Sequence, residues 1–151
     1  MKTNITFEEM LNQWKVAPNK FASGLFKTKL EIGETYVREF KRSFDLQKDP
    51  RGKFWRTRKR NYNHPILNET GALKNSISYQ LYDGGGLMIY TDENSFPAGR
   101  RKHDSKSYAA FHNSQDGTYP PNIQRQFMGD SPLMELKVQN MLYKLLQSII
   151  S

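Results

Sequence analysis

The sequence contains no cysteine and no long apolar run. The first absence excludes disulfides, thiolate zinc sites and a cysteine nucleophile. The second is typical of a chain that does not span a membrane, because a spanning helix needs roughly 18 apolar residues in succession. The opening residues, MKTNITFEEMLNQW, carry acids where a signal peptide has its apolar run, so we do not expect secretion by that route. We expect a soluble chain made in a reducing cytoplasm, without a membrane partner.

What the chain does contain is positive charge and aromatic residues. Its 151 residues suffice for one domain with a hydrophobic core, and 13% of them are aromatic. The 23 Lys and Arg residues outnumber the 15 Asp and Glu residues, which gives a net charge of +8. This balance favours contact with polyanions, either nucleic acid or acidic proteins.

The N-terminal third has helical periodicity. Residues 1–17 place apolar side chains at three- and four-residue spacing, and Pro18 is expected to end this segment. Residues 19–46 carry the longest helical signal, with Asn19 as a plausible cap. The apolar stripe of this second segment consists of Phe21, Leu25, Ile32, Tyr36, Phe40 and Phe44. We therefore divide the chain into an arm or short helix over residues 1–18 and a single α+β domain over residues 19–151.

The periodicity changes after Pro65. The stretch ILNETGALKNSI predicts a short helical turn, capped by Asn68 or Thr70. SISYQLY then alternates as a strand does, DGGG is a turn signal, and LMIYT predicts the returning strand. IQRQFM, residues 123–128, could add a third β element.

The last helix is expected to begin at GDSP, with Asp130 or Ser131 as its cap. Its apolar positions predict one broad stripe, made of Leu133, Leu136, Met141, Leu142, Leu145 and Ile149. The order of elements predicts an α+β fold, in which a long N-terminal helix and a C-terminal helix pack on a small antiparallel sheet with a central hairpin.

No catalytic pattern is visible. The three histidines, His64, His103 and His112, are not at ligand spacing, and the acids form no paired set on one predicted element. A G-x-S-x-G nucleophile turn is absent, and DGGG is followed by a strand rather than by the helix of a phosphate-binding loop. We expect no enzyme activity, no cofactor and no metal site. The enzymatic alternative is a nuclease in which His112 and Asn113 polarise water and a metal ion.

Two basic segments can face DNA or a protein partner. KFWRTRKR has the composition of a phosphate-contacting surface, and the polar loop of residues 92–107 adds more cations. Trp55 could stack on a base, but we favour a buried anchor. The basic residues of the two segments are Lys53, Arg56, Arg58, Lys59, Arg60, Arg100, Arg101 and Lys102.

Four blocks follow one another along the chain: DPRGKFW (Asp49–Trp55), ILNETGALKNSI (Ile66–Ile77), YAAFHN (Tyr108–Asn113) and RQFMGDSP (Arg125–Pro132). They match the pattern D-x-x-G-x-x-W, I-L-x-x-T-G-x-L-x-x-S-I, Y-A-x-x-H and R-x-F-x-G in order and spacing. Over roughly residues 40–150 the chain therefore resembles the phage virion morphogenesis (tail completion) proteins of Mu-like tailed phages.

The resemblance implies a structural subunit of the virion rather than an enzyme. Such a subunit forms a homo-oligomeric ring at the head–tail junction or tail end, is assembled in the host cytoplasm, and contacts other neck or tail proteins. A closed ring needs two different, complementary faces on each copy, and the long helix and the 92–107 loop are the candidates. A basic lumen can contact passing DNA without reading its sequence. The alternative is a basic nucleic-acid-binding or nuclease module.

The resemblance also assigns positions. Gly71 and Gly129 are expected to need special backbone conformations, and Thr70 and Ser76 to satisfy nearby backbone donors. Trp55, Leu73 and Phe127 are expected to pack in the core. The full set of family-pattern positions is Gly52, Trp55, Leu67, Thr70, Gly71, Leu73, Ser76, Tyr108, His112, Arg125, Phe127 and Gly129.

Overall fold

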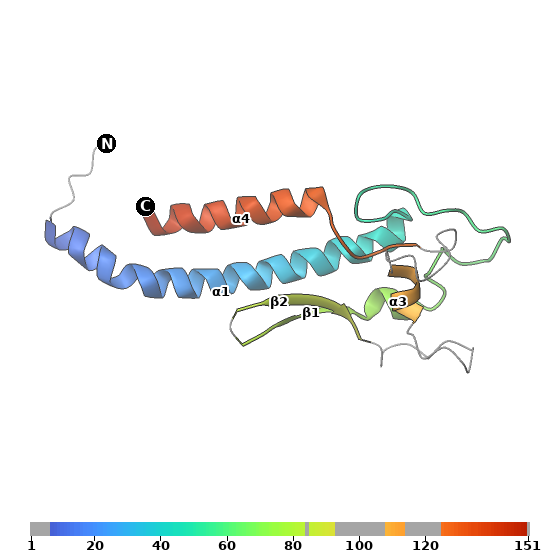
Figure 1. Ribbon diagram of the computed structural model, residues 1–151, viewed down its shortest axis with the longest axis horizontal. Helices are drawn as coiled ribbons and strands as arrows, with labels where there is room; N and C mark the ends of the chain where they lie inside the picture. Colours follow the sequence, from blue (N-terminus) through green and yellow to red (C-terminus); the bar gives the residue numbers. More distant parts are fainter. Residues whose placement is uncertain (1–6, 84, 93–107, 114–124, 151) are drawn as a thin grey trace.

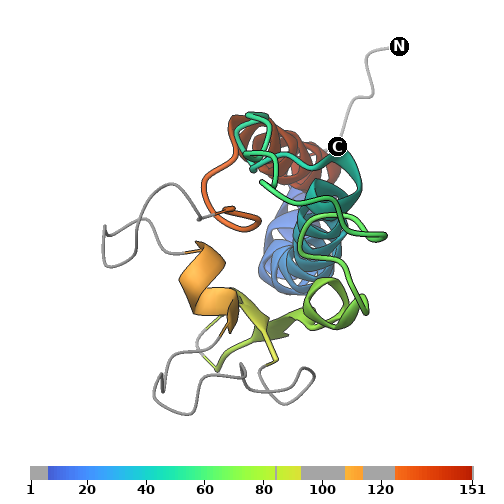
Figure 2. The ribbon, with the colours of Figure 1, turned by 90° about the vertical axis from the view of Figure 1, so that its right-hand side faces the viewer.

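The computed structural model describes residues 7–83, 85–92, 108–113 and 125–150 and has three layers (Figures 1 and 2). A long helix lies in the middle, the C-terminal helix lies along one side of it, and a β-hairpin with two short helices covers the other side. In chain order the elements are α1 (Phe7–Leu46), α2 (Ala72–Asn75), β1 (Ile77–Leu81), β2 (Leu87–Thr91), α3 (Tyr108–Asn113) and α4 (Pro132–Ile150). The predicted α+β class and its arrangement of helices and hairpin are confirmed.

Helix α1 is one continuous element of 40 residues, about 60 Å long at 1.5 Å per residue. The helix end predicted at Pro18 is wrong, because Pro18 lies inside α1. A proline removes one backbone hydrogen bond, but its own φ is compatible with a helix. The apolar spacing continues on both sides of Pro18, so one helix satisfies both segments. The predicted C-terminal end at residue 46 is confirmed.

The hairpin is antiparallel, with Tyr79 opposite Ile89 and Leu81 opposite Leu87. The predicted strands and turn are confirmed. The third β element is not found in its described part, residues 125–128, which lies outside the two-stranded sheet. The side-chain oxygen Oδ1 of Asn113 accepts hydrogen bonds from the backbone N–H groups of Phe127 (3.1 Å) and Met128 (2.8 Å). These two donors bind a side chain instead of a neighbouring strand.

Gly33 allows the hairpin to lie directly against α1. A Cβ atom at this position would overlap the ring of Tyr79, meeting Cγ at 2.7 Å and Cε2 at 2.8 Å. Gly33 lowers helix propensity by about 1 kcal/mol relative to Ala. The close approach of strand β1 explains why the position is nevertheless a glycine.

The hydrophobic core lies toward the C-terminal half of α1. Phe44 is fully buried there and contacts the rings of Trp55 and Phe127, with centroid separations of 5.5 and 5.1 Å. The buried cluster draws on α1 and on all four sequence blocks, and consists of Phe40, Phe44, Trp55, Leu73, Ile77, Ala109 and Phe127. The packing role predicted for Trp55, Leu73 and Phe127 is confirmed.

Helix α4 runs antiparallel to α1 (Figure 1). Ser131 acts as its cap, since Oγ accepts the backbone N–H of Met134 at 3.4 Å, and the prediction of a cap at this position is confirmed. Lys137 of α4 bonds Glu39 of α1 at 2.7 Å. Further along, Leu145 lies against Gly24, where an added Cβ would come within 2.5 Å of the leucine Cδ1.

The single broad stripe predicted for α4 is wrong. Met134 and Leu145 are buried against the rest of the molecule, whereas Leu133 and Leu136 are each 55% exposed. Leu142, at 37% exposed, lies between the two sides. The helix carries apolar side chains on two faces, and α1 covers only one of them. A similar correction applies to α1, where Phe21 is 41% exposed rather than in the core.

Candidate interaction surfaces

The turn after α1 is built by Asp49. Its carboxylate Oδ1 accepts the backbone N–H groups of Arg51 at 3.0 Å and Lys53 at 2.8 Å, while Gly52 takes a φ of 89°. This closed turn directs Trp55 into the core, where it is 7% exposed and donates its indole N–H to the carbonyl of Gln126. Trp55 is the buried anchor that we favoured, so its ring is not free to stack on a base.

The second block turns at Gly71, which has a φ of 74° and stands at the start of α2. Only a residue without Cβ adopts this left-handed backbone without strain, and the prediction for Gly71 is confirmed. Thr70 Oγ1 accepts the backbone N–H of Ala72 at 3.3 Å, as expected. Ser76 acts in the opposite sense from the prediction, because its hydroxyl donates to the carbonyl of Leu73 at 2.8 Å.

A residue that sequence reasoning missed connects this block to the end of α1. Gln47 has a φ of 54°, its Oε1 accepts the backbone N–H of Ile66 at 3.0 Å, and its Nε2 donates to the carbonyl of Phe44. Leu67 also has a positive φ, of 57°. No sequence signal marks Gln47, since glutamine is an ordinary helix residue and its partner is 19 positions away.

The third and fourth blocks meet at His112 and Arg125. The backbone N–H of Arg125 donates to the carbonyl of His112 at 3.2 Å, and its Nε donates to the carbonyl of Arg56 at 3.3 Å. His112 is buried, and Gly129 has the positive φ, 141°, that we predicted for it. The side chain of Tyr108 lies outside the described part of the chain.

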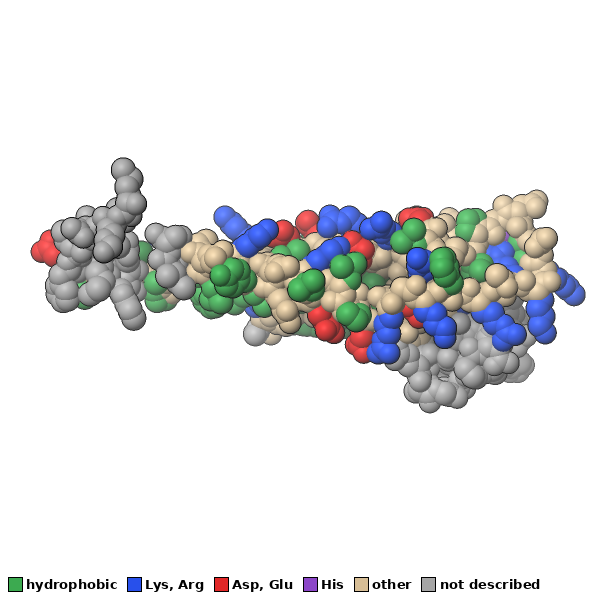
Figure 3. Space-filling model, turned by 90° about the horizontal axis from the view of Figure 1, so that it is seen from above, with side chains coloured by type: hydrophobic (Ala, Val, Ile, Leu, Met, Phe, Trp, Pro, Cys, Tyr) green, Lys and Arg blue, Asp and Glu red, His purple; other side chains and the backbone are tan. Residues whose placement is uncertain are grey.

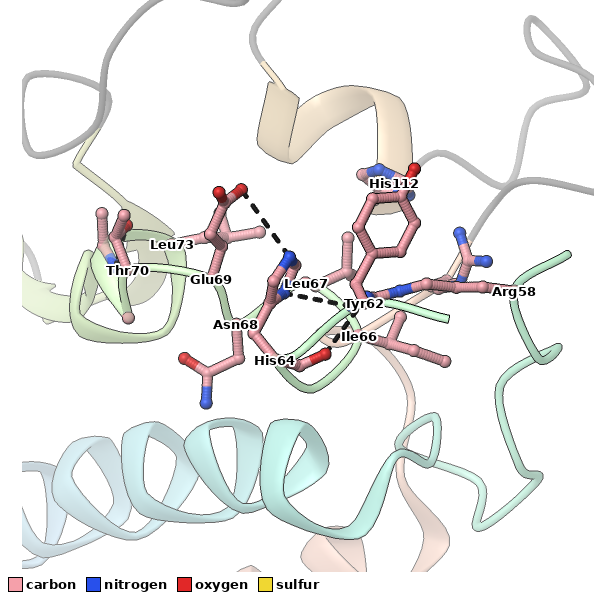
Figure 4. Close-up of a pocket in the computed structure, with 13 residues that line it drawn as sticks. Arg58, Tyr62, His64, Ile66, Leu67, Asn68, Glu69, Thr70, Leu73 and His112 are labelled. Carbon is pink, nitrogen blue, oxygen red and sulfur yellow. Dashed lines mark hydrogen bonds and ion pairs between the residues drawn. The ribbon is translucent and has the colours of Figure 1, made fainter. Parts of the chain in front are cut away.

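A pocket of about 480 Å³ opens between α3 and the loop that leads to α2 (Figure 4). Arg58 lies over the ring of Tyr62, 5.0 Å from its centroid, and donates to the carbonyls of His64 (3.1 Å) and Pro65. His64 Nε2 is 4.0 Å from a carboxylate oxygen of Glu69. In this arrangement Arg58 supports the path of the loop. The remaining lining residues are Ile66, Leu67, Asn68, Thr70, Gly71, Ala72, Leu73, His112 and Arg125.

The basic residues of KFWRTRKR (residues 53–60) divide into one that is held by hydrogen bonds and four that are exposed to solvent. Arg58 is held by backbone carbonyls, whereas the other cations of the run are exposed: Lys53, Arg56, Lys59 and Arg60. We call these four the basic surface. Figure 3 shows Lys and Arg side chains along one edge of the molecule, toward the end opposite the N-terminus. Arg100, Arg101 and Lys102 lie outside the described residues, as does most of the 92–107 loop.

Within the residues that the structure describes, no group of three or more His, Cys, Asp or Glu side chains is placed to hold a metal ion. No helix in that same part of the chain is long and apolar enough to cross a membrane. The pKa of Tyr36 is raised by its burial and by the nearby carboxylates of Glu135 and Asp130. Tyr36 packs beside the core, so this shift reflects the α1–α4 contact rather than a catalytic site.

Among the residues that the structure describes, α4 carries an exposed apolar surface. We call it the outer face of α4, and it consists of Leu133, Leu136, Tyr143 and Leu146, whose exposed fractions are 55%, 55%, 61% and 50%. The residues are spaced by three, seven and three positions, which places them on one side of a helix. Figure 3 looks onto α4 and shows hydrophobic side chains among charged ones. The sequence shows that these residues are apolar. It does not show which face of α4 packs against α1.

A second apolar surface lies on α1 beyond the reach of α4. Leu145 lies opposite Gly24, and the helices are antiparallel, so Ile150 ends opposite about residue 19. We call residues 7–18 the arm. Leu11 is 41% exposed on it, and Val16, 44% exposed, projects from another side of the helix, about 140° away at 3.6 residues per turn. The predicted division after residue 18 thus falls where the cover of α4 ends, not where a helix ends.

Comparison of the chain with protein-family models, with curated proteins and with solved structures finds no match.

Proposed function

We propose that the chain is a structural subunit of a tailed-phage virion, which assembles into a ring at the head–tail junction or tail end. The observation that carries this proposal is the outer face of α4, where four large hydrophobic side chains are at least half exposed. Monomeric proteins rarely leave such contiguous apolar patches open, and patches of this kind mark protein–protein contacts. A role in assembly gives this face a partner.

The spatial arrangement of the four sequence blocks supports the phage assignment. Trp55 of the first block bonds Gln126 of the fourth, and Asn113 of the third bonds Phe127 of the fourth. Leu73 of the second block is buried in the same cluster. Blocks that are far apart in the chain therefore form one packed unit, as expected if the pattern specifies a common fold.

The basic surface fits the same role. Lys53, Arg56, Lys59 and Arg60 are exposed and do not line the pocket beside Arg58, and Trp55 is withdrawn into the core. Cations on an open surface bind phosphates without sequence readout. In a ring through which DNA passes, such a surface attracts the DNA and lets it slide.

The same basic surface also favours the alternative, a nucleic-acid-binding or nuclease module. The two functions differ in what the isolated protein does. Size-exclusion chromatography with light scattering, run over a range of protein concentrations, is expected to show one closed oligomer of defined mass. A protein that remains monomeric throughout and cleaves DNA when a divalent metal is added would support the alternative and overturn the virion role.

A further inference from the structure

We infer that the arm of one copy, residues 7–18, docks on the outer face of α4 of a neighbouring copy. This inference rests on the proposed function and names the two surfaces that meet in the ring. Each surface is apolar and exposed, and each belongs to a different helix. A contact between two different surfaces is heterologous, and its repetition closes a ring when the rotation between copies divides a full turn.

The arm is held less firmly than the rest of α1. It is the first 12 residues of the continuous helix, and the cover of α4 does not reach it. Pro18 weakens it further, since a proline in a helix interior costs about 3 kcal/mol. A second helix packed along the arm would bury its apolar side chains and offset the cost of Pro18.

The arm continues an apolar stripe that is buried further along α1. At 3.6 residues per turn, Phe21 falls within about 20° of Ile32 around the helix, and Leu11 within about 60°. Ile32 is 8% exposed, whereas Leu11 and Phe21 are each 41% exposed. The apolar stripe therefore runs on beyond the described contacts of α4. The sequence places Phe7, Met10 and Trp14 in the same periodic pattern.

The two surfaces match in length and in charge. The arm is about 18 Å long, and the outer face of α4, from Leu133 to Leu146, is about 20 Å long. The first turn of the arm is acidic, with Glu8 exposed, and Lys144 is exposed beside the outer face. This pairing favours contact between copies, although an exposed ion pair contributes only about 0–1 kcal/mol and apolar burial must dominate.

The contact must be made between copies. Within one copy, α4 meets α1 through Met134 and Leu145, on the side of α4 opposite Leu136 and Tyr143. The arm extends past the C-terminal end of α4 (Figure 1). It therefore lies beyond the outer face of its own α4 and does not cover it.

The absence of cysteine makes a direct test simple, because every disulfide must come from an introduced residue. Leu11→Cys and Leu136→Cys are made in separate proteins of distinguishable mass, mixed at high concentration and oxidised gently. The expected product is a crosslink between the two variants. As a control, Leu11→Cys is mixed with Gln80→Cys, which places an exposed cysteine on β1 and is expected to crosslink far less.

A second pair of variants tests the same contact without crosslinking. Leu136→Arg is expected to dissociate the oligomer into folded monomers, whereas Gln80→Arg, at an exposed position on the hairpin, is expected to leave its mass unchanged. Circular dichroism confirms that both variants remain folded, which is expected because both positions are exposed in the monomer.

The outcomes separate the inference from the proposed function. A ring of defined mass that gives no Leu11–Leu136 crosslink and survives Leu136→Arg overturns the docking of the arm but leaves the ring. Crosslinks formed only between identical variants also overturn it, because they indicate a two-fold contact. A chain that stays monomeric at every concentration, with random crosslinking, overturns both.

Discussion

Trp55 donates its indole N–H to the backbone carbonyl of Gln126 at 2.7 Å, across 71 positions of sequence. The ring of Trp55 packs edge-on against Phe44, which also contacts Phe127. One side chain thus joins the end of α1 to the segment that precedes α4. This contact holds the segment that leads into α4 against the end of α1.

Substitution of Trp55 tests this contact. Trp55→Phe keeps a ring in the core but leaves the Gln126 carbonyl without its donor, and is expected to lower the free energy of unfolding by about 1–3 kcal/mol. Trp55→Ala adds a cavity and is expected to cost about 3–5 kcal/mol. Phe54→Leu is the control, because Phe54 is 69% exposed, and its effect is expected within about 0.5 kcal/mol. Urea unfolding measures all three, and equal effects at the two positions would contradict the account.

The two glycines of α1 allow a matched comparison. Gly33→Ala drives a methyl group into the rigid ring of Tyr79, at a cost of about 1–3 kcal/mol, against a gain in helix propensity of about 1 kcal/mol. Gly24→Ala meets only the flexible end of Leu145, which can rotate away. We expect a lower urea midpoint for Gly33→Ala than for Gly24→Ala. The reverse order would mean that the hairpin does not lie directly on α1.

The raised pKa of Tyr36 predicts a loss of stability in alkali. The neutral phenol is favoured in the folded state, so the folded protein holds its proton to a higher pH than the unfolded chain does. The stabilisation is complete below pH 10.0, the ordinary pKa, and is lost as the pH rises through the folded value. Tyr36→Phe should therefore show a shallower fall in unfolding free energy above pH 10.0 than the unaltered protein. Identical slopes would refute this role for the phenol.

The basic surface predicts a salt-dependent affinity for DNA. Neutralising Arg56, Lys59 and Arg60 with glutamine removes up to three phosphate contacts and should reduce the slope of log K against log salt by about 2–3. The control neutralises Lys27, Arg38 and Arg42 on α1, which are exposed and give the same change in net charge. If both triple variants lose affinity equally, net charge rather than the basic surface holds the DNA.

The sequence predicted those elements that depend on neighbouring residues. Asp49-Pro50 lies just after the end of α1 at Leu46, Ser131 caps α4, and DGGG turns the hairpin, because each signal acts over a few positions. The incorrect predictions concern segments whose structure depends on residues far away in the sequence. The segment at Phe127 bonds Asn113 rather than a strand, and α1 selects one of the two apolar faces of α4. Gln47 was missed for the same reason, since its partner at Ile66 is known only from the fold.

The central claim is that the chain forms a closed ring. Electron microscopy of the purified protein at high concentration tests it most directly, since end-on views reveal symmetry and a central opening. We expect closed rings of one subunit number, abolished by Leu136→Arg and retained with Gln80→Arg. Particles that are monomers, two-fold dimers or open filaments under the same conditions would contradict it.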